Sequence, residues 1–474
     1  MTGADAIALL PLIVLAGTSV LVMVGIAVRR SHRFTLGLTL AGLAAAFGSL
    51  WIAAPLAPRQ VTPLLVIDHY ALFYFGLLIA AGFAVALLAY DYLAKVDINR
   101  EELYVLLLIA TLGAAVLVAS SHFASFFLGL EMLSVSLYAM VAYLRPRRQP
   151  LEAGIKYLIL AAASAAFLLF GMALVYADLG TMEFGRMAHM LQSGNNVMVI
   201  SGLALIITGI GFKLAVVPFH LWTPDVYEGA SAPVTAFIAT VSKGAMFALL
   251  LRYFYRSGAA TNHRILLLFS IIAIASMLAG NLLALLQSNV KRILAYSSIA
   301  HMGYLLVAFL ASGELAVEAV TFYLVAYFIT TLGAFGVVSA LSTHDREAED
   351  IDDYHALFWR RPAVAGVFTL MLLSLAGIPV TAGFIGKFYI VAAGASSAMW
   401  ALVIILVVSS VIGLFYYLRI VAAMYASPER GAIETGSRIS SAAGAVLCML
   451  AVLLVWFGIY PEPLLRLIRT VLRA

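Results

Sequence analysis

Lysines interrupt the apolar stretches of this sequence at positions where a charge is expensive. Lys213 lies in the run LIITGIGFKLAVVPFHLWTPDVYEGASAPVTAFIATVSKGA (205–245), just before Pro218, and Lys243 lies in the apolar segment that follows. Inside a bilayer each lysine costs about 2.5–3.5 kcal/mol on insertion scales. Backbone that leaves the helix at membrane depth is tolerated only where protein or water satisfies it. Two lysines beside a helix break therefore predict part of an ion pathway.

A second apolar stretch, SLAGIPVTAGFIGKFYI (374–390), repeats this combination of a break and a lysine. Gly377 and Pro379 interrupt it, and Lys387 follows. In transporters built from inverted repeats, breaks at corresponding positions of the two halves point to the ion site. The spacing therefore predicts that Lys213 and Lys387 occupy equivalent places in two repeats.

Three further ionisable residues, Glu131, His301 and His220, lie in or beside apolar segments. Glu131 is nine residues into its predicted helix, about 14 Å at 1.5 Å per residue. Each candidate also has a purely structural interpretation. Glu131 and the histidines could be satisfied by hydrogen bonds in the core, and Lys213 and Lys387 could extend to the membrane interface. The depth of the charges favours the functional interpretation.

Lysine suits a proton relay because its protonation responds to its surroundings. Burial favours the neutral amine, whereas a nearby carboxylate favours the charged one. At about 6 Å and an effective dielectric of about 20, the attraction is roughly 3 kcal/mol. Movement of Glu131 relative to Lys213 would therefore make the lysine take up or release a proton. We predict a file of Lys213, Lys243 and Lys387 linked by water, with His301 and hydroxyl groups between them.

The composition defines the kind of scaffold that must hold these groups. Of 474 residues, 64% are hydrophobic and only 11% are charged, which predicts an all-α polytopic membrane protein. With about 20 residues per crossing we expect about fourteen transmembrane helices, of which the seventh and the twelfth are broken. The predicted segments are 5–28, 34–57, 70–94, 103–120, 122–144, 154–178, 197–217, 231–255, 262–286, 289–311, 314–342, 363–391, 399–425 and 440–472.

The separation of the two breaks predicts the internal organisation. The seventh and the twelfth helix are five positions apart along the chain. An odd number of crossings between equivalent units turns the second unit upside down. We therefore expect two inverted five-helix repeats, helices 4–8 (103–255) and helices 9–13 (262–425). Helices 1–3 (1–102) precede them and helix 14 (440–474) follows.

Basic residues in the loops predict the orientation. With the N-terminus outside, sixteen of the 28 Lys and Arg residues fall on the inside and eight on the outside. The other four, Lys213, Lys243, Lys387 and Arg419, lie within helices. The bias predicts a multi-pass protein of a bacterial inner membrane with both termini on the periplasmic side. The net charge of +5 reflects this loop bias and carries no inference of nucleic-acid binding.

No redox or nucleotide chemistry is predicted for this chain. Cys448 is its single cysteine, whereas iron–sulfur clusters need several thiolates. Neither a GxGxxG motif after a strand nor a Walker motif occurs. We therefore expect no metal or cofactor site here, and any redox centre belongs to other subunits.

The run KLAVVPFHLWTPDVYEGASAPVTAFIATVSK (213–243), together with the helix of Glu131, resembles the antiporter-like membrane subunits of proton-pumping NADH:quinone oxidoreductase, respiratory complex I. These subunits are similar to Mrp-type antiporter subunits. The resemblance covers essentially the whole chain. Within the family it is most similar to the N branch, because Lys387 stands where the M branch would have Glu. The chain also lacks the long lateral helix of the L branch.

The resemblance implies roles for individual residues. Glu131 matches the glutamate of the fifth helix, Lys213 the lysine of the broken seventh, Lys243 the lysine of the eighth and Lys387 the residue of the twelfth that serves the exit half-channel. It implies that FMN, iron–sulfur clusters and quinone are held by other subunits, and leaves room for structural lipids. Subunit M and small membrane subunits such as K are the implied neighbours.

Alternative functions share these charged helices. An Mrp-type cation/proton antiporter or membrane-bound hydrogenase subunit would co-purify with other small membrane proteins and carry no NADH activity. A stand-alone secondary transporter would function alone in liposomes. A non-transporting scaffold would carry intramembrane charges without purpose. We therefore expect a proton-translocating subunit of a translocase, driven by electron transfer elsewhere.

Overall fold

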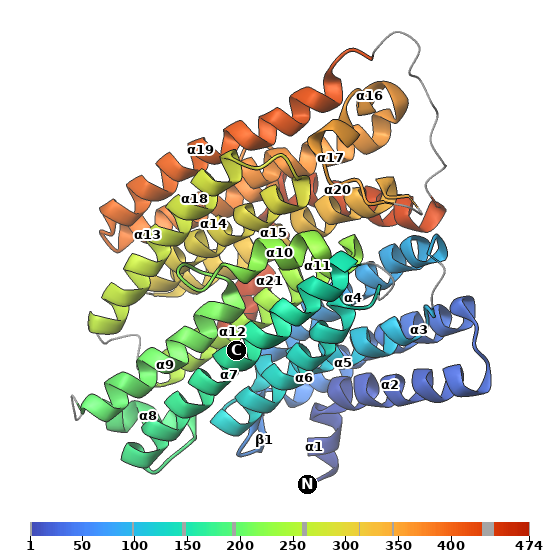
Figure 1. The fold of residues 1–474 in the computed structure, drawn as a ribbon. Helices are drawn as coiled ribbons and strands as arrows, with labels where there is room; N and C mark the ends of the chain where they lie inside the picture. Colours follow the sequence, from blue (N-terminus) through green and yellow to red (C-terminus); the bar gives the residue numbers. More distant parts are fainter. Residues whose placement is uncertain are drawn as a thin grey trace.

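The computed structural model describes residues 2–96, 99–144, 148–191, 196–257, 263–311, 313–343, 346–428 and 440–473. Long helices run side by side across the molecule (Figure 1). Helices from the first half of the chain lie in the lower part of this view, and helices from the second half lie above them. Several arginines of the predicted inside loops, Arg145, Arg147, Arg430 and Arg438, lie outside the described residues.

The first half of the chain is helical apart from one hairpin. Its elements are α1 (Gly3–Ala8), α2 (Leu10–Val28), α3 (His32–Ala53), the 3₁₀ turn η1 (Ala54–Leu56), β1 (Arg59–Thr62), β2 (Leu65–Ile67), α4 (His69–Ala94), α5 (Glu102–Ala119), α6 (Phe123–Val141), α7 (Arg148–Leu179), α8 (Phe184–Leu191), α9 (Val197–Leu214), α10 (Trp222–Gly229), α11 (Ala232–Phe237), the π-helix η2 (Ile238–Ser242) and α12 (Lys243–Ser257).

The second half follows the same pattern. Its elements are α13 (His263–Leu285), α14 (Val290–Leu310), α15 (Glu314–Leu341), the 3₁₀ turn η4 (Ile351–Tyr354), α16 (Leu357–Arg360), α17 (Pro362–Ala376), α18 (Ala382–Ser396), α19 (Trp400–Tyr425), α20 (Ser441–Ile459) and α21 (Glu462–Arg473).

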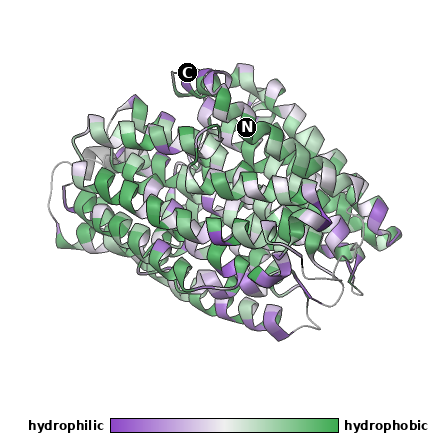
Figure 2. Cartoon of the chain, turned by 90° about the horizontal axis from the view of Figure 1, so that it is seen from above, coloured by the Kyte–Doolittle hydropathy of each residue, from purple (hydrophilic) through white to green (hydrophobic). Residues whose placement is uncertain are grey.

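The predicted class of fold is confirmed. Within the described ranges, thirteen helices are long and apolar enough to cross a membrane. The shorter apolar helices α17 and α18 together occupy the predicted broken segment 363–391. Most of the ribbon is hydrophobic when coloured by hydropathy (Figure 2). Hydrophobic helices of this kind suit the hydrocarbon core of a bilayer, in which a helix satisfies its own backbone hydrogen bonds.

One local prediction was wrong, and two features were not predicted. The segment 440–472 is two helices, because Pro461 has no N–H to donate and α20 ends at Ile459. Residues 59–67, for which no element was expected, form the antiparallel pair β1–β2. Lys291, one of the basic residues counted on the inside, lies in the first turn of α14 and is fully buried. Its ammonium is satisfied by protein groups.

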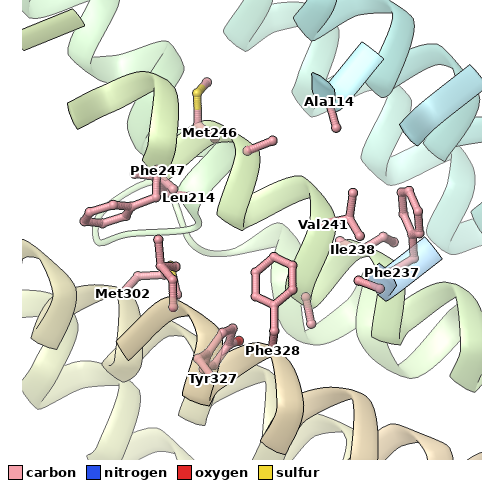
Figure 3. Close-up of a cluster of buried hydrophobic side chains, with 14 of the residues drawn as sticks. Ala114, Leu214, Phe237, Ile238, Val241, Met246, Phe247, Met302, Tyr327 and Phe328 are labelled. Carbon is pink, nitrogen blue, oxygen red and sulfur yellow. The ribbon is translucent and has the colours of Figure 1, made fainter. Parts of the chain in front are cut away.

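The continuous helix formed by α11, η2 and α12 lies at the centre of the molecule, and its most apolar window is entirely buried. Figure 3 shows side chains from this helix, including Ile238 and Met246, in one buried hydrophobic cluster with Tyr327 and Phe328 of α15. A Cβ added at Gly244 would lie 2.4 Å from Phe328 Cζ, so this glycine allows α15 to approach closely. The close packing fixes the residue beside it, Lys243.

Candidate functional site

The first helix break follows Lys213. Ala215 has a left-handed backbone (φ 60°), and the amides of Ala215 and Val216 donate to Phe212 O and Gly211 O, which is a Schellman termination of α9. Pro218 then prevents the helix from resuming at once. Lys213, in the last turn of α9, is 3% exposed and donates to Ser134 Oγ at 2.9 Å and to Tyr157 Oη at 3.1 Å.

The second break has the same backbone geometry, but its lysine binds different partners. Gly377 is left-handed (φ 86°), and the amides of Gly377 and Ile378 donate to Ser374 O and Leu373 O. Lys387 of α18 reaches back across the break to α17. Its ammonium donates to Leu375 O at 2.8 Å, Ala376 O at 2.9 Å and Ser410 Oγ at 2.7 Å. The lysine thereby satisfies the last carbonyls of a helix, at the negative end of its dipole.

Lys243 is held by a different local feature, the π-helix η2, which ends at the residue before it. Single π-turns occur inside α-helices mostly at functional sites. Lys243 is 1% exposed, donates to Ser298 Oγ at 2.7 Å and lies 5.4 Å from the centre of the Tyr227 ring. The ammonium is therefore stabilised by one hydroxyl and one aromatic face.

His301 lies between the last two lysines. It is buried in α14, one turn after Ser298, and its charge interacts with those of Lys387 and Lys243. Its Nδ1 is 2.6 Å from Tyr323 Oη and its Nε2 is 3.3 Å from Tyr417 Oη. Both ring nitrogens thus have a partner that can either donate or accept a proton.

Hydroxyl groups connect these ionisable side chains. Ser298 Oγ is 2.6 Å from Tyr327 Oη and 3.4 Å from Tyr227 Oη, so it joins Lys243 to two tyrosines. On the far side of His301, the Tyr304 ring lies 5.3 Å from the imidazole and 5.1 Å from Lys387 Nζ. The order along the site is therefore Lys213, Lys243, His301, Lys387.

Glu131 and His220 flank this file without a hydrogen bond to it. Glu131 is partly exposed on α6, one turn before Ser134, and its charge interacts with that of Lys213. His220 is buried in the segment between α9 and α10. The hydrogen bonds of Lys213 go to α6 and α7 instead. The structure thus brings Glu131 into electrostatic range of the file and leaves His220 beside the break.

Helix α10 lies beside both Lys213 and Lys243. Trp222 stacks on the ring of Tyr157, the partner of Lys213, and its indole donates to Phe212 O at 2.9 Å. Tyr227, on the same helix, faces Lys243. The acidic residues of α10 pair outward: Arg292 donates to Asp225 at 3.0 Å and to Glu228 at 2.6 Å. Asp225 also accepts from Lys156 of α7 at 3.0 Å, so both acidic residues connect α10 to neighbouring helices rather than to the lysines of the site.

Sequence reasoning missed several of these groups. Tyr227, Tyr327 and Tyr323 read as ordinary apolar positions of buried helices, and only their contacts show that their hydroxyls face the lysines. The π-turn before Lys243 leaves no composition signal. A hydroxyl at helical spacing from a buried ionisable residue, such as Ser298 before His301, is the signal that could have identified them. No cluster of three His, Cys, Asp or Glu side chains that could hold a metal occurs in the described ranges.

Comparison with known proteins places this geometry in a family. The profile of the family described as NADH:quinone oxidoreductase/Mrp antiporter, transmembrane, matches residues 120–413, which contain all the ionisable residues above. NADH-quinone oxidoreductase subunit N of Nitrosospira multiformis is 56% identical over 481 aligned residues, covering 97% of this chain and 95% of that protein.

Solved structures agree. A chain of respiratory complex I from Thermus thermophilus, solved with bound aureothin, is 33% identical with a TM-score of 0.83, covering 96% of this chain and 98% of that one. A chain of the Mrp complex of a Dietzia species has a TM-score of 0.88, covering 99% and 97%, but only 22% identity, so it shares the fold. The chain therefore belongs to the family of NADH-quinone oxidoreductase N subunits, within the NADH:quinone oxidoreductase/Mrp antiporter membrane proteins.

Proposed function

We propose that this chain is a proton-translocating membrane subunit of NADH:quinone oxidoreductase, in which electron transfer in other subunits drives protons through its buried file. One observation carries the proposal. Three lysines, Lys213, Lys243 and Lys387, are each at most 8% exposed, and each donates to a hydroxyl group. An ionisable residue inside a membrane is energetically expensive. Buried ammonium groups bonded to hydroxyls are therefore explained by function rather than by packing.

In the proposed path, a proton enters near Lys213 under the influence of Glu131. Between Tyr157 and Tyr227 the described residues supply no direct hydrogen bond, and water completes this step. From Lys243 the proton passes through Ser298 and Tyr327 towards His301. Hydroxyl groups suit this role because each can donate and accept at once.

The last step of the proposed path leads from His301 to Lys387. The ring of Tyr304 lies between them, and its hydroxyl receives a hydrogen bond from Asn281 at 2.9 Å. Tyr416 donates to the amide oxygen of Asn281 at 2.9 Å, which fixes the amide orientation. We assign Lys387 to the exit side, and Tyr304 and Asn281 to the wall of the path between His301 and Lys387.

The two breaks support the proposed inverted repeats, 103–255 and 262–425. Both breaks use a Schellman termination followed by a proline, at Ala215 with Pro218 and at Gly377 with Pro379. In inverted-repeat transporters such breaks occur at equivalent positions of the two halves. We propose that α9–α10 and α17–α18 are equivalent elements, and that residues 1–102 and 440–474 lie outside the repeats.

The remaining parts of the proposal concern the surroundings of the chain. Large apolar side chains are exposed along α2, α3, α7, α19 and α20, where lipid or neighbouring subunits would cover them. Subunit M and small subunits such as K are the proposed neighbours. Both termini are placed on the periplasmic side of a bacterial inner membrane. FMN, iron–sulfur clusters and quinone are assigned to other subunits, and none to this chain.

The test is the variant Lys213→Ala in the intact complex, reconstituted in liposomes. We expect fewer protons pumped per NADH oxidised, because the first carrier of the file is lost. Arg186→Ala is the control, since Arg186 is an exposed basic residue of α8 paired with Glu183 at 2.7 Å. Unchanged pumping per NADH in Lys213→Ala would overturn the proposed path. A tagged chain that purifies in an assembly without flavin would instead favour an antiporter.

A further inference from the structure

An apolar groove of about 890 Å³ runs between α17 and α20, on the outer face of the second half of the chain. Apart from two serines at one end, its lining is apolar or cysteine. It begins beside the N-termini of both helices and ends at Trp456. The lining residues are Ala363, Val364, Val367, Leu370, Ser440, Ser441, Gly444, Leu447, Cys448, Ala451, Val452, Val455 and Trp456.

The length of the groove fits one leaflet of a bilayer. Along α20 it extends from Ser441 to Trp456, about 22 Å at 1.5 Å per residue. Half of a bilayer with its headgroup zone measures about 20–22 Å. A transmembrane helix of another subunit would need a groove that crosses both leaflets. The dimensions therefore favour a lipid, with its acyl chain against α17 and α20.

Basic side chains gather at the end where the headgroup would lie. Arg361 is the N-cap residue of α17, two positions before the first groove residue Ala363. Arg360 precedes it and donates to the backbone oxygens of Asp353 and His355. Lys95, the C-cap of α4, donates to Ser342 O at 2.8 Å, and its charge interacts with those of Asp91 and Arg361.

Of the acidic groups that the structure describes near this end, two have partners of their own. Asp91 accepts a short hydrogen bond from Ser440, the N-cap of α20. Asp353 is paired with Arg346 and accepts from the amides of Glu349 and Asp350. Asp352 lines the adjoining polar cavity together with Arg360 and Arg361. Arg360, Arg361 and the N-termini of two helices thus lie at this end of the groove, and both features attract an anion.

A smaller groove elsewhere differs from this one in the charges at its end. It has about 420 Å³, lies between α2, α5 and α6, and is lined by Met23, Ile26 and Tyr143 among others. Its lining includes Glu102, which pairs with Arg30 at 2.5 Å. The charges at that groove compensate each other, so it has no preference for an anionic headgroup.

We propose that the groove between α17 and α20 binds one anionic phospholipid, with its phosphate at Arg361 and Arg360 and an acyl chain along Gly444, Cys448 and Val452. Basic pockets between transmembrane helices recognise anionic headgroups in this way. The site lies outside the lysine file, on the face of α17 that leads to the second break. The lipid would brace α17, whose C-terminal carbonyls hold Lys387.

The intact complex in liposomes tests this site with two photoactivatable lipids, each carrying a diazirine in one acyl chain. One is a phosphatidylglycerol and the other the matched phosphatidylcholine. We expect the anionic lipid to label the peptide that contains Cys448, the single cysteine of the chain. Equal labelling by the two lipids would overturn the proposal, because it would indicate bulk lipid. Cross-linking of Cys448 to another subunit would also overturn it, because a protein would then fill the groove.

Variants separate the headgroup from the acyl chain. Arg361→Gln is expected to lower labelling roughly fivefold, whereas Arg361→Lys retains it, because one basic residue near an anionic headgroup is worth about that factor. Gly444→Leu places a large side chain in the groove at an open position, since a Cβ at Gly444 meets nothing within 4 Å, and is expected to abolish labelling. Gly366→Leu, equally open but outside the groove lining, is the control. Unchanged labelling in both Arg361→Gln and Gly444→Leu would refute the site.

Discussion

The side chains that connect the lysines are neutral hydroxyls rather than further charges. Ser298 joins Lys243 to Tyr327, and Tyr323 and Tyr417 occupy the two nitrogens of His301. A hydroxyl needs no counter-charge, so it can extend a path through a low-dielectric region at little electrostatic cost. At this scale the function depends on single oxygen atoms.

Tyr327→Phe removes one such oxygen and keeps the ring. We expect the rate of proton pumping to fall by about 2- to 10-fold, the factor given by the roughly 0.5–1.5 kcal/mol of one hydrogen bond. The measurement is proton uptake by liposomes that contain the complex. Tyr74→Phe is the control, because its buried hydroxyl contacts Thr321 at 3.2 Å, away from the lysines. Equal rates in the two variants would exclude Tyr327 from the path.

At the scale of the elements, the two broken helices could be predicted from the sequence, because glycine and proline next to a buried lysine leave a clear pattern. Both breaks lie where they were expected, after Leu214 and after Ala376. The roles of the candidate site residues remain predictions.

Other features of the elements could not be predicted, for physical reasons. The π-turn before Lys243 packs against α15, which is distant along the chain, and no glycine or proline marks it in the sequence. The burial of Lys291 could not be predicted because its partners, the oxygens of Glu228 and Ala230 and the carboxylate of Glu347, are about 60 residues away along the chain. Long-range contacts of this kind leave no periodicity in the sequence.

Gly383→Ala tests the second break as an element. An added Cβ would lie 2.0 Å from Ser374 O and 2.6 Å from Ser374 Oγ, so the start of α18 must move away from α17. We expect a loss of about 1–3 kcal/mol in stability, typical of overpacking, and slower pumping. Thermal unfolding of the purified complex measures the first effect. Gly366→Ala, with open space at its Cβ, should behave as the parent does; indistinguishable midpoints for the two variants would contradict this account.

At the scale of the whole molecule, one buried cluster joins the two halves of the chain. Lys291 of α14 donates to Glu228 O at 2.6 Å and Ala230 O at 2.7 Å, and pairs with Glu347. Glu347 also accepts from the amide of Ala232, the first residue of α11. The segment after the first break is thereby fixed to the N-terminus of α14 and to the segment after α15.

Glu347→Gln leaves Lys291 as a buried charge without compensation. We expect a loss of about 3–5 kcal/mol and a fall of at least about 5 °C in the unfolding midpoint of the complex. Glu462→Gln is the matched control, because its pair with Arg466 is on the surface of α21 and contributes about 0–1 kcal/mol. Replacing both residues, with Lys291→Met and Glu347→Leu, should recover much of the loss. A midpoint in Glu347→Gln as high as in the control would show that the pair does not hold the halves together.

The contacts of Lys387 have an arithmetic consequence for the molecule as a whole. An ammonium has three hydrogens, and this one has three acceptors: Leu375 O, Ala376 O and Ser410 Oγ. A neutral amine has two hydrogens and one lone pair, so when Lys387 gives up its proton it can donate to only two of these groups. Ser410 can keep its contact by donating its hydroxyl hydrogen to the lone pair, so the hydrogen bonds beside the second break must rearrange. Lys213 has two such acceptors and can keep both when neutral. An empty carrier is therefore compatible with unchanged hydrogen bonds at the first break, whereas at the second break the loss of the proton changes them.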